Sequence, residues 1–115
     1  MLPKNYRLPS NKILPVIKNG EFFPSKNFNI RFLAKKSGGL KIAILIPIRL
    51  EKKAAKRNRA KRLLREAIRQ HLTQIKTNGE IVVLAKKNIF SISLQDLSKE
   101  IRELLNTLNN EKIKE

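Results

Sequence analysis

The stretch KKAAKRNRAKRLLREAIRQH, residues 52–71, carries nine Lys or Arg side chains and a single Glu. Its apolar residues recur with the 3.6-residue period of a helix, so we predict an amphipathic helix from about Lys53 to Ile75. The predicted apolar stripe consists of Ala60, Leu64, Ala67, Ile68, His71, Leu72 and Ile75. A polar side about 120° away around the helix axis holds Asn58, Arg62, Arg65, Arg69 and Lys76. Solvated helix faces normally mix charges of both signs, so this one indicates an anionic partner.

The composition of the whole chain points the same way. Its 115 residues include 26 basic and 9 acidic side chains, a formal net charge of +17. Such a charge costs folding free energy through self-repulsion, which a polyanion relieves, so nucleic acid is the leading partner. No apolar run is long enough to span a membrane, and the N-terminus lacks the apolar segment of a secretion signal. We therefore expect a cytoplasmic protein that does not act in a membrane, and a length of 115 residues favours one domain over 1–115.

Other segments of the chain alternate between helix and strand patterns. A short helix is predicted to end at Asn19-Gly20, because Gly suits the position after a helix. Ser93, with Asp96 three residues on, is predicted to cap the last helix, which should end near Leu108 and leave a flexible tail from about residue 109. Strand patterns occupy Phe28–Lys36, Leu40–Ile48 and Glu80–Lys87, with a short strand or turn at Glu21–Phe23.

These elements predict a small α+β domain with helices packed on one sheet. The turn sequence KSGGL predicts that the strands Phe28–Lys36 and Leu40–Ile48 form a hairpin. Alternation places Phe28 and Phe32 in the core, on the side of their strand opposite Arg31. Asn78-Gly79 is predicted to end the long basic helix.

Protein-borne catalysis is not indicated by the available side chains. A metal-dependent nuclease needs converging carboxylates, and the chain has one Asp, Asp96, and eight scattered Glu. There is no Cys, so neither a disulfide nor a thiolate metal site can form. The single His, His71, falls on the predicted apolar stripe, where a structural role is expected. We therefore predict no catalytic residue and no protein metal site.

The sequence KRNRAKRLLREAIR, residues 56–69, resembles the RNR signature of the bacterial ribonuclease P protein component. The likeness extends to NYRL (5–8) and VIKNG (16–20), which resemble that family's basic N-terminal segment and first helix. EIVVLAKK (80–87) and SLQDLSKEIRELL (93–105) resemble its later strand and closing helix. The resemblance covers about residues 4–108.

This resemblance implies the element order α-β-β-β-α-β-α, with a sheet of about four strands. It also implies the ribosomal-protein-S5-domain-2-like fold, in which a left-handed βαβ crossover carries the basic helix. The usual rule for parallel crossovers would give the opposite hand. In function, the resemblance implies the protein subunit of ribonuclease P, a monomer bound to the ribonuclease P RNA. That RNA would perform the Mg²⁺-dependent endonucleolytic removal of the 5′ leader from precursor tRNA, and would hold most of the Mg²⁺.

Residues can be assigned to two surfaces through this resemblance. The RNA-binding set is Lys53, Lys56, Arg57, Asn58, Arg59, Lys61, Arg62, Arg65 and Arg69. The cleft expected to hold the tRNA leader comprises Arg7, Ile13, Ile17, Arg31 and Arg49. Here the chain departs from the family pattern, because aromatic side chains usually occupy the positions of Ile13, Ile17 and Arg31. The loop PIRLEKKAA (47–55) is also one residue longer than usual, with Arg49 in the place of a lysine.

Three other interpretations are compatible with the residues alone. Asn58 could be a helix cap or turn residue as well as an RNA contact. The chain could be a noncatalytic RNA-binding protein of the ribosome or of its assembly. It could instead bind a membrane surface, although basic helices of that kind usually carry Trp or Phe on the apolar side.

Overall fold

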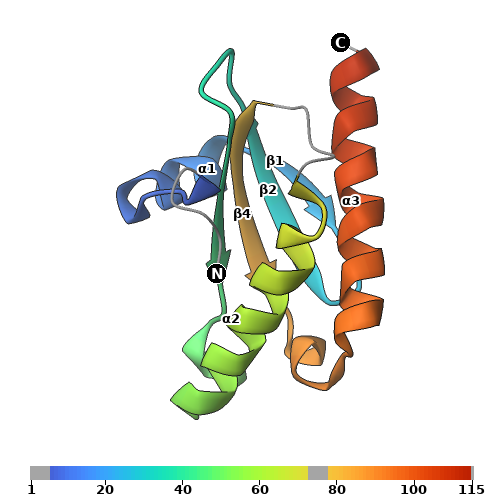
Figure 1. Ribbon diagram of the computed structural model, residues 1–115. Coiled ribbons are helices and arrows are strands. Elements are labelled where there is room, and N and C mark those ends of the chain that lie inside the picture. Colours follow the sequence, from blue (N-terminus) through green and yellow to red (C-terminus); the bar gives the residue numbers. More distant parts are fainter. Residues whose placement is uncertain (1–5, 73–77, 115) are drawn as a thin grey trace.

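The computed structural model describes residues 6–72 and 78–114, which form one four-stranded mixed sheet with helices on both faces (Figure 1). The strands are β1 (Glu21–Pro24), β2 (Phe28–Ala34), β3 (Leu40–Leu45) and β4 (Gly79–Ala85). The helices are α1 (Ile13–Asn19), α2 (Ala54–Arg69) and α3 (Leu94–Lys114), with the 3₁₀ turns η2 (Ser10–Lys12), η3 (Ile48–Leu50) and η5 (Lys87–Ser91). The predicted α+β class and the predicted order of helices and strands are confirmed.

The predicted hairpin between the second and third strands is wrong. The sheet order is β1-β2-β4-β3, so β4 lies between β2 and β3 and pairs with both of them. Gly38 and Gly39 do adopt the positive φ values, 96° and 74°, that a Gly-Gly turn requires. The prediction of a Gly-containing turn between β2 and β3 was therefore correct. A local turn pattern, however, cannot reveal that a strand from later in the chain lies between the two strands that the turn connects. A hairpin does form one step earlier, between β1 and β2.

The connection from β3 through α2 to β4 is a left-handed crossover, as the family resemblance implied. The two strands are parallel and adjacent. In Figure 1 both run downward, α2 lies in front of the sheet, and β4 lies to the right of β3. Rotating the view until the strands point upward moves β4 to the left of β3, and a step to the left behind a covering helix is left-handed.

The sheet buries its two faces unequally. Alternate residues of β2, including Phe28, Ile30 and Phe32, point into the main core beneath α2 and α3, as predicted for the two Phe residues. The opposite face carries Val82, which packs with Val16 of α1 in a second, smaller core. Because α1 has only seven residues, it covers part of that face. The exposed Phe22 at 45% and the half-buried Arg31 lie on this second face, outside the main core.

Helix α2 has the predicted apolar stripe but is shorter than predicted. Ala60, Leu64, Ala67, Ile68 and Leu72 are buried, whereas the α-helix ends at Arg69 rather than near Ile75. Ile75 and Lys76 lie outside the described residues. The Asn78-Gly79 pair does not end the helix: the Asn78 side chain accepts a hydrogen bond from the Gly39 N–H at 3.0 Å, and Gly79 begins β4.

Three local predictions have clear outcomes. Ser93 caps α3, since its Oγ accepts a hydrogen bond from the Asp96 N–H at 3.2 Å. Asn58 is neither a cap nor a turn residue, because Lys53 is the N-cap of α2 and Asn58 lies exposed within the helix. Helix α3 continues to Lys114, so its predicted end near Leu108 is wrong, and residues 109–114, expected as a tail, have a helical backbone. That segment contains neither Gly nor Pro, and an established helix propagates readily through polar residues.

A polar contact fastens the β1–β2 turn to α3. Asn27 is the one buried polar residue in the described part of the chain. Glu100 of α3 accepts hydrogen bonds from the Asn27 backbone N–H at 2.9 Å, from Asn27 Nδ2 at 2.5 Å and from the Ser25 hydroxyl. The Lys86 ammonium donates to the Ser25 carbonyl. The buried Asn27 side chain thus has a hydrogen-bond partner on its Nδ2, as expected for a buried amide.

The close approach of Gly79 in β4 to the Phe32 ring in β2 can be tested by substitution. A Cβ at position 79 would lie 2.4 Å from the Phe32 ring and 3.0 Å from the Leu33 carbonyl oxygen. Because the ring is held in the main core, we expect Gly79→Ala to lower the free energy of unfolding by about 1–3 kcal/mol, measured by urea denaturation. Ser37→Ala, in the exposed β2–β3 turn, is the control and should change stability by less than about 0.5 kcal/mol. Equal stability of both variants would contradict the close approach.

Candidate nucleic-acid interface

The outward arc of α2 is a nearly unbroken row of cationic and polar side chains. With 100° per residue, Lys61, Arg65, Asn58, Arg69, Arg62 and Arg59 follow one another around the side opposite the buried stripe. Asn58, Arg59, Arg62 and Arg69 are exposed, while Lys61 and Arg65 are half-buried. We call this set the α2 basic face. Glu66 is the only carboxylate on α2.

The amino-terminal end of α2 adds to this positive potential. The first turn contains no acidic residue, and the N-cap residue Lys53 makes no side-chain cap hydrogen bond. The helix dipole places partial positive charge at this end, where cations are unfavourable and anions are favourable. The sequence thus places Lys53 and Lys56 where an anion, rather than another protein cation, is stabilising.

Arg57 has a structural contact in addition to any contact with a partner. Its Nη1 donates to the carbonyl oxygens of Glu51 and Lys52, both at 2.9 Å, and so holds the loop before α2 against the helix. Sequence reasoning assigned this arginine to the RNA surface only. Its half-buried side chain and two backbone acceptors show that part of its donor capacity is already used.

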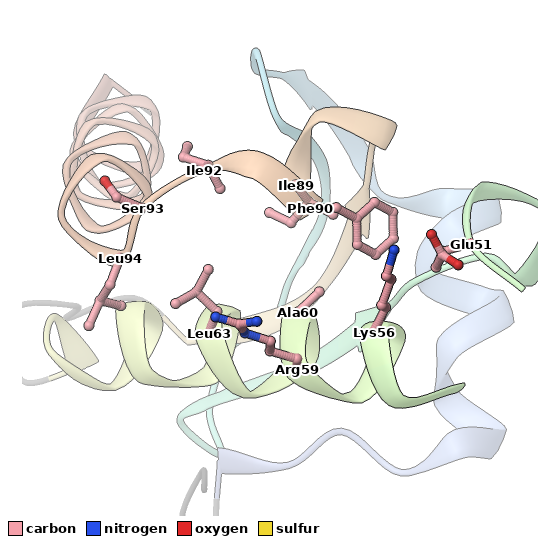
Figure 2. Close-up of a pocket in the computed structure, with 10 residues that line it drawn as sticks. All are labelled: Glu51, Lys56, Arg59, Ala60, Leu63, Ile89, Phe90, Ile92, Ser93 and Leu94. Carbon is pink, nitrogen blue, oxygen red and sulfur yellow. The ribbon is translucent and has the colours of Figure 1, made fainter. Parts of the chain in front are cut away.

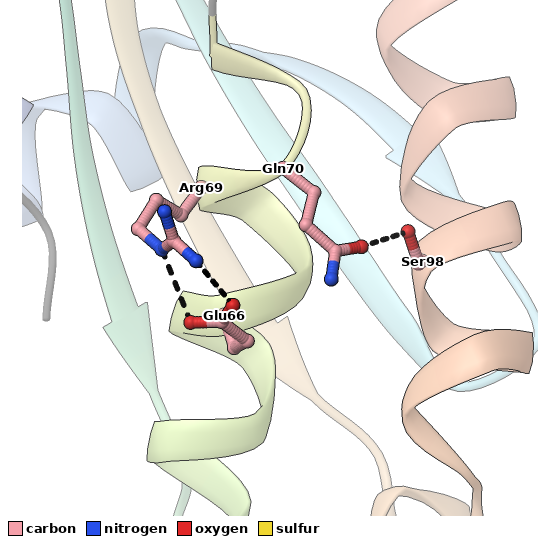
Figure 3. Close-up of polar contacts among 4 residues, drawn as sticks. All are labelled: Glu66, Arg69, Gln70 and Ser98. Atoms are coloured by element: carbon pink, nitrogen blue, oxygen red, sulfur yellow. Dashed lines mark hydrogen bonds and ion pairs between the residues drawn. The ribbon is translucent and has the colours of Figure 1, made fainter.

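Arg69 is paired within α2 (Figure 3). Its Nη2 and Nε donate to the two carboxylate oxygens of Glu66 at 2.5 and 3.1 Å. These hydrogen bonds hold the pKa of the Glu66 carboxyl below its ordinary value and raise the pKa of Arg69. The stability that this pair contributes is therefore present at neutral pH and is lost as the pH falls through the lowered pKa of Glu66. Since the pair is exposed, it mainly neutralises the carboxy-terminal end of the α2 basic face.

Four of the other cations of α2 line two hollows on opposite sides of the helix. Lys61 and Arg65 border one of about 280 Å³, together with Arg7, Leu8 and β3. Lys56 and Arg59 border another of about 390 Å³, beneath η5 (Figure 2). The predicted RNA-binding residues thus lie on one helix and its N-cap, and their surface has three adjoining parts: the outward arc and, at its two edges, these two hollows.

The predicted leader-cleft residues are brought together only in part. Ile13 and Ile17 of α1 are half-buried and pack against the smaller core beside Val82, whose register partner on β2 is Arg31. Arg7 instead lies beside the edge strand β3, where residues 7 and 42 form a bridge, and near Lys61. Arg49 is exposed in η3, before α2.

Sequence reasoning missed Phe22. Strand pairing places Phe22 of β1 directly opposite Arg31 of β2, and the guanidinium carbon lies 4.6 Å from the centre of the phenyl ring. This is a cation–π contact that keeps an exposed aromatic and an arginine fixed together. The segment Glu21–Phe23 had been predicted as a strand or turn, but without the register nothing in the sequence paired it with Arg31.

His71 has the structural role predicted for it. Its Nε2 lies 2.8 Å from the Ser98 hydroxyl. That hydroxyl in turn donates a hydrogen bond to Gln70 Oε1 at 2.7 Å (Figure 3). These contacts join the end of α2 to α3. Within residues 6–72 and 78–114, no group of three or more His, Asp or Glu side chains could hold a metal ion. Among the same residues, no helix is long and apolar enough to cross a membrane.

The fold and this surface define a class: a small α+β protein that presents a basic helix on a left-handed crossover. A family model described as Ribonuclease P matches residues 2–109. The ribonuclease P protein component of Picosynechococcus sp. is 31% identical over 105 residues, which cover 90% of each chain. That of Nitrosomonas eutropha is 34% identical over 73 residues, 61% of this chain and 60% of the relative. A solved Staphylococcus aureus RNase P protein mutant superposes with a TM-score of 0.81 at 21% identity, covering 92% of this chain and 90% of that chain.

The chain belongs to the ribonuclease P protein component family. This membership gives it a role in the processing of the 5′ end of tRNA, in association with an endoribonuclease complex, and implies ribonuclease P RNA as its partner. The family predicted from the RNR-like stretch is thereby confirmed.

The Glu66–Arg69 pair generates a charge test. Glu66→Gln removes the one carboxylate of α2 and releases Arg69, so we expect tighter binding to ribonuclease P RNA and a log–log salt slope steeper by up to about one unit. Binding is measured by fluorescence anisotropy from low to moderate salt. Glu103→Gln, an exposed carboxylate of α3, makes the same charge change away from α2 and should leave the slope unchanged. A Glu66→Gln slope equal to that of Glu103→Gln would show that Arg69 does not contact the RNA.

Proposed function

We propose that this chain is the protein subunit of ribonuclease P, that it binds the catalytic RNA through the α2 basic face, and that it contacts the 5′ leader of precursor tRNA through the second face of the sheet. The RNA subunit performs the hydrolysis and holds the Mg²⁺. The observation that carries this proposal is the row of cations on one rigid helix in a member of this family. The described residues also contain no cluster of His, Asp or Glu side chains that could hold a metal ion. The protein acts as a monomer within the cytoplasmic ribonucleoprotein.

The α2 basic face supplies affinity without sequence readout. Each phosphate neutralised by Lys or Arg releases condensed counterions. Arginines such as Arg62 and Arg65 can also fork onto two phosphate oxygens, which lysine cannot do. Positive charge placed between two RNA molecules lowers their mutual repulsion, so the catalytic RNA and precursor tRNA can approach each other. Their complex then binds Mg²⁺ at a lower concentration of free Mg²⁺.

The leader surface uses an aromatic from a different element than the family pattern suggested. Ile13 and Ile17 give α1 an aliphatic side, but Phe22 on β1 supplies an exposed ring, with Arg31 stacked on it. A base that stacks on such a platform gains about 1–3 kcal/mol. We therefore propose Phe22 and Arg31 as the principal leader contacts, and Arg7 and Arg49 as phosphate contacts outside this platform.

The contribution of the α2 basic face can be measured through salt dependence. We expect the triple variant Lys61→Ala, Arg62→Ala, Arg65→Ala to flatten the log–log salt slope of ribonuclease P RNA binding by about 2–3 units. Alanine preserves the helix. The control is Lys26→Ala, Lys99→Ala, Arg102→Ala, which removes three exposed cations from the β1–β2 turn and α3. Equal slopes for the two triple variants would exclude the α2 basic face from the interface.

Reconstitution tests the function directly. Purified full-length protein, added at low Mg²⁺ to a bacterial ribonuclease P RNA and a precursor tRNA, should accelerate leader removal, scored as 5′-end cleavage on a gel. The α2 triple variant should accelerate it less than the control triple variant does. Tight RNA binding without any acceleration would contradict the proposed function and would favour a noncatalytic RNA-binding role.

Phe22 should matter for the leader and not for the mature tRNA body. We expect Phe22→Leu to weaken binding of the reconstituted complex to precursor tRNA about fivefold or more, with unchanged affinity for mature tRNA. Ile48→Ala, which truncates another exposed apolar side chain, 65% exposed in η3, serves as the control. Loss of affinity for both tRNA forms, or for neither, would remove Phe22 from the leader surface.

A further inference from the structure

The hollow between α2 and η5 has the properties of a small-ligand site (Figure 2). Its volume is about 390 Å³, near the lower end of the usual range for small-molecule sites, about 300–1,000 Å³. Its floor is formed by the buried Ala60 and Ile89. One flat organic group of nucleobase size, with its sugar, matches this volume, whereas a protein helix does not.

The walls of this hollow are apolar and incompletely covered. Leu63, Phe90 and Ile92 pack against the main core, yet each is only half-buried. Figure 2 shows Leu63 on the α2 side and Phe90 and Ile92 on the opposite side of the hollow. The Phe90 ring therefore offers aromatic surface that the protein itself does not cover.

Two cations stand at the rim. Lys56 and Arg59 are exposed, and in the described part of the chain neither makes an ion pair. In Figure 2, Lys56 extends from α2 toward Phe90, and the Arg59 guanidinium lies beside Leu63. Aromatic and aliphatic walls below two unpaired cations suit a molecule with a flat base and a phosphate. An apolar peptide or a hydrocarbon chain would leave these cations unused.

Glu51 adds a directional group. Its Oε1 accepts a hydrogen bond from the Lys53 N–H at 3.1 Å, so its carboxylate is held at the rim. A carboxylate accepts hydrogen bonds from the exocyclic amino groups of bases. Adenine, cytosine and guanine carry such a group. Uracil does not, and its one donor on that edge, N3–H, lies between two carbonyl oxygens that repel a carboxylate.

We infer that the α2–η5 hollow captures one unpaired, unstacked nucleotide of the RNA partner, with its base against Phe90 and Leu63 and its phosphate on Lys56 and Arg59. The capture disfavours uridine because of Glu51. This inference rests on the proposed function, which supplies the RNA. It adds a base contact at the Arg59 edge of the α2 basic face, whose other cations contact only phosphate.

The test uses the ¹⁵N-labelled full chain titrated with adenosine 5′-monophosphate, uridine 5′-monophosphate and inorganic phosphate. We expect adenosine 5′-monophosphate to shift the amide signals of residues 56–63 and 89–94 in a saturable way, with an affinity at least about threefold higher than that of the uridine nucleotide. Inorganic phosphate should affect only the rim. Identical shift patterns for all three probes would overturn the inference, because charge alone would then explain binding.

Phe90→Leu separates this inference from the proposed function. It keeps an apolar side chain of similar size in the core while removing the ring, so we expect about fivefold or greater loss of adenosine 5′-monophosphate affinity. Phe90→Tyr should retain the affinity. The salt slope for ribonuclease P RNA should stay unchanged in both variants, because no charge is altered. Unchanged nucleotide affinity in Phe90→Leu would overturn the inference that the hollow binds a base, without affecting the role proposed for the α2 basic face. Failure of the wild-type chain to bind the RNA would instead refute the proposed function itself.

Discussion

The burial of one apolar stripe of α2 holds a row of mutually repelling cations on a single rigid element. Leu64 and Ala67 are fully buried, and Ala60 and Ile68 are nearly so. Each large aliphatic side chain of this kind stabilises the fold by about 1.5–3 kcal/mol. Two like charges 4 Å apart in water repel by only about 1 kcal/mol, and salt screens them further. Burial therefore outweighs repulsion, and the unrelieved charge remains available to an RNA partner.

The two faces of the sheet are covered by different helices and to different extents. β4 is buried on both sides, with Ile81 and Val83 facing α2 and α3 and Val82 facing α1. Because α1 is short, part of the second face remains uncovered, and there Phe22 and Arg31 lie together. One small domain thus carries two distinct surfaces, the α2 basic face on one side and the pair Phe22–Arg31 on the other, and the proposed function assigns one RNA molecule to each.

The density of basic residues does not give every one of them the same role. Arg57 fastens the loop before α2, and Arg69 is neutralised by Glu66. Lys61 and Arg65 lean toward β3, whereas Lys56 and Arg59 lean toward η5. A helix presents its side chains all around its axis, so neighbours in sequence reach different neighbours in space. The RNR-like stretch is therefore better described as three adjoining surfaces than as one uniform patch.

The sequence by itself determined the elements that depend on local periodicity and capping: the basic helix and its buried stripe, the alternation of β2, the Ser93 cap and the structural role of His71. It also determined the family, through the KRNRAKRLLREAIR stretch. Only the tertiary structure decided the insertion of β4 between β2 and β3, the pairing of Phe22 with Arg31, and the separation of Arg7 from the other predicted cleft residues. Strand order and register join residues that are far apart in the chain, and no local pattern encodes which distant partner buries the remaining apolar surface best.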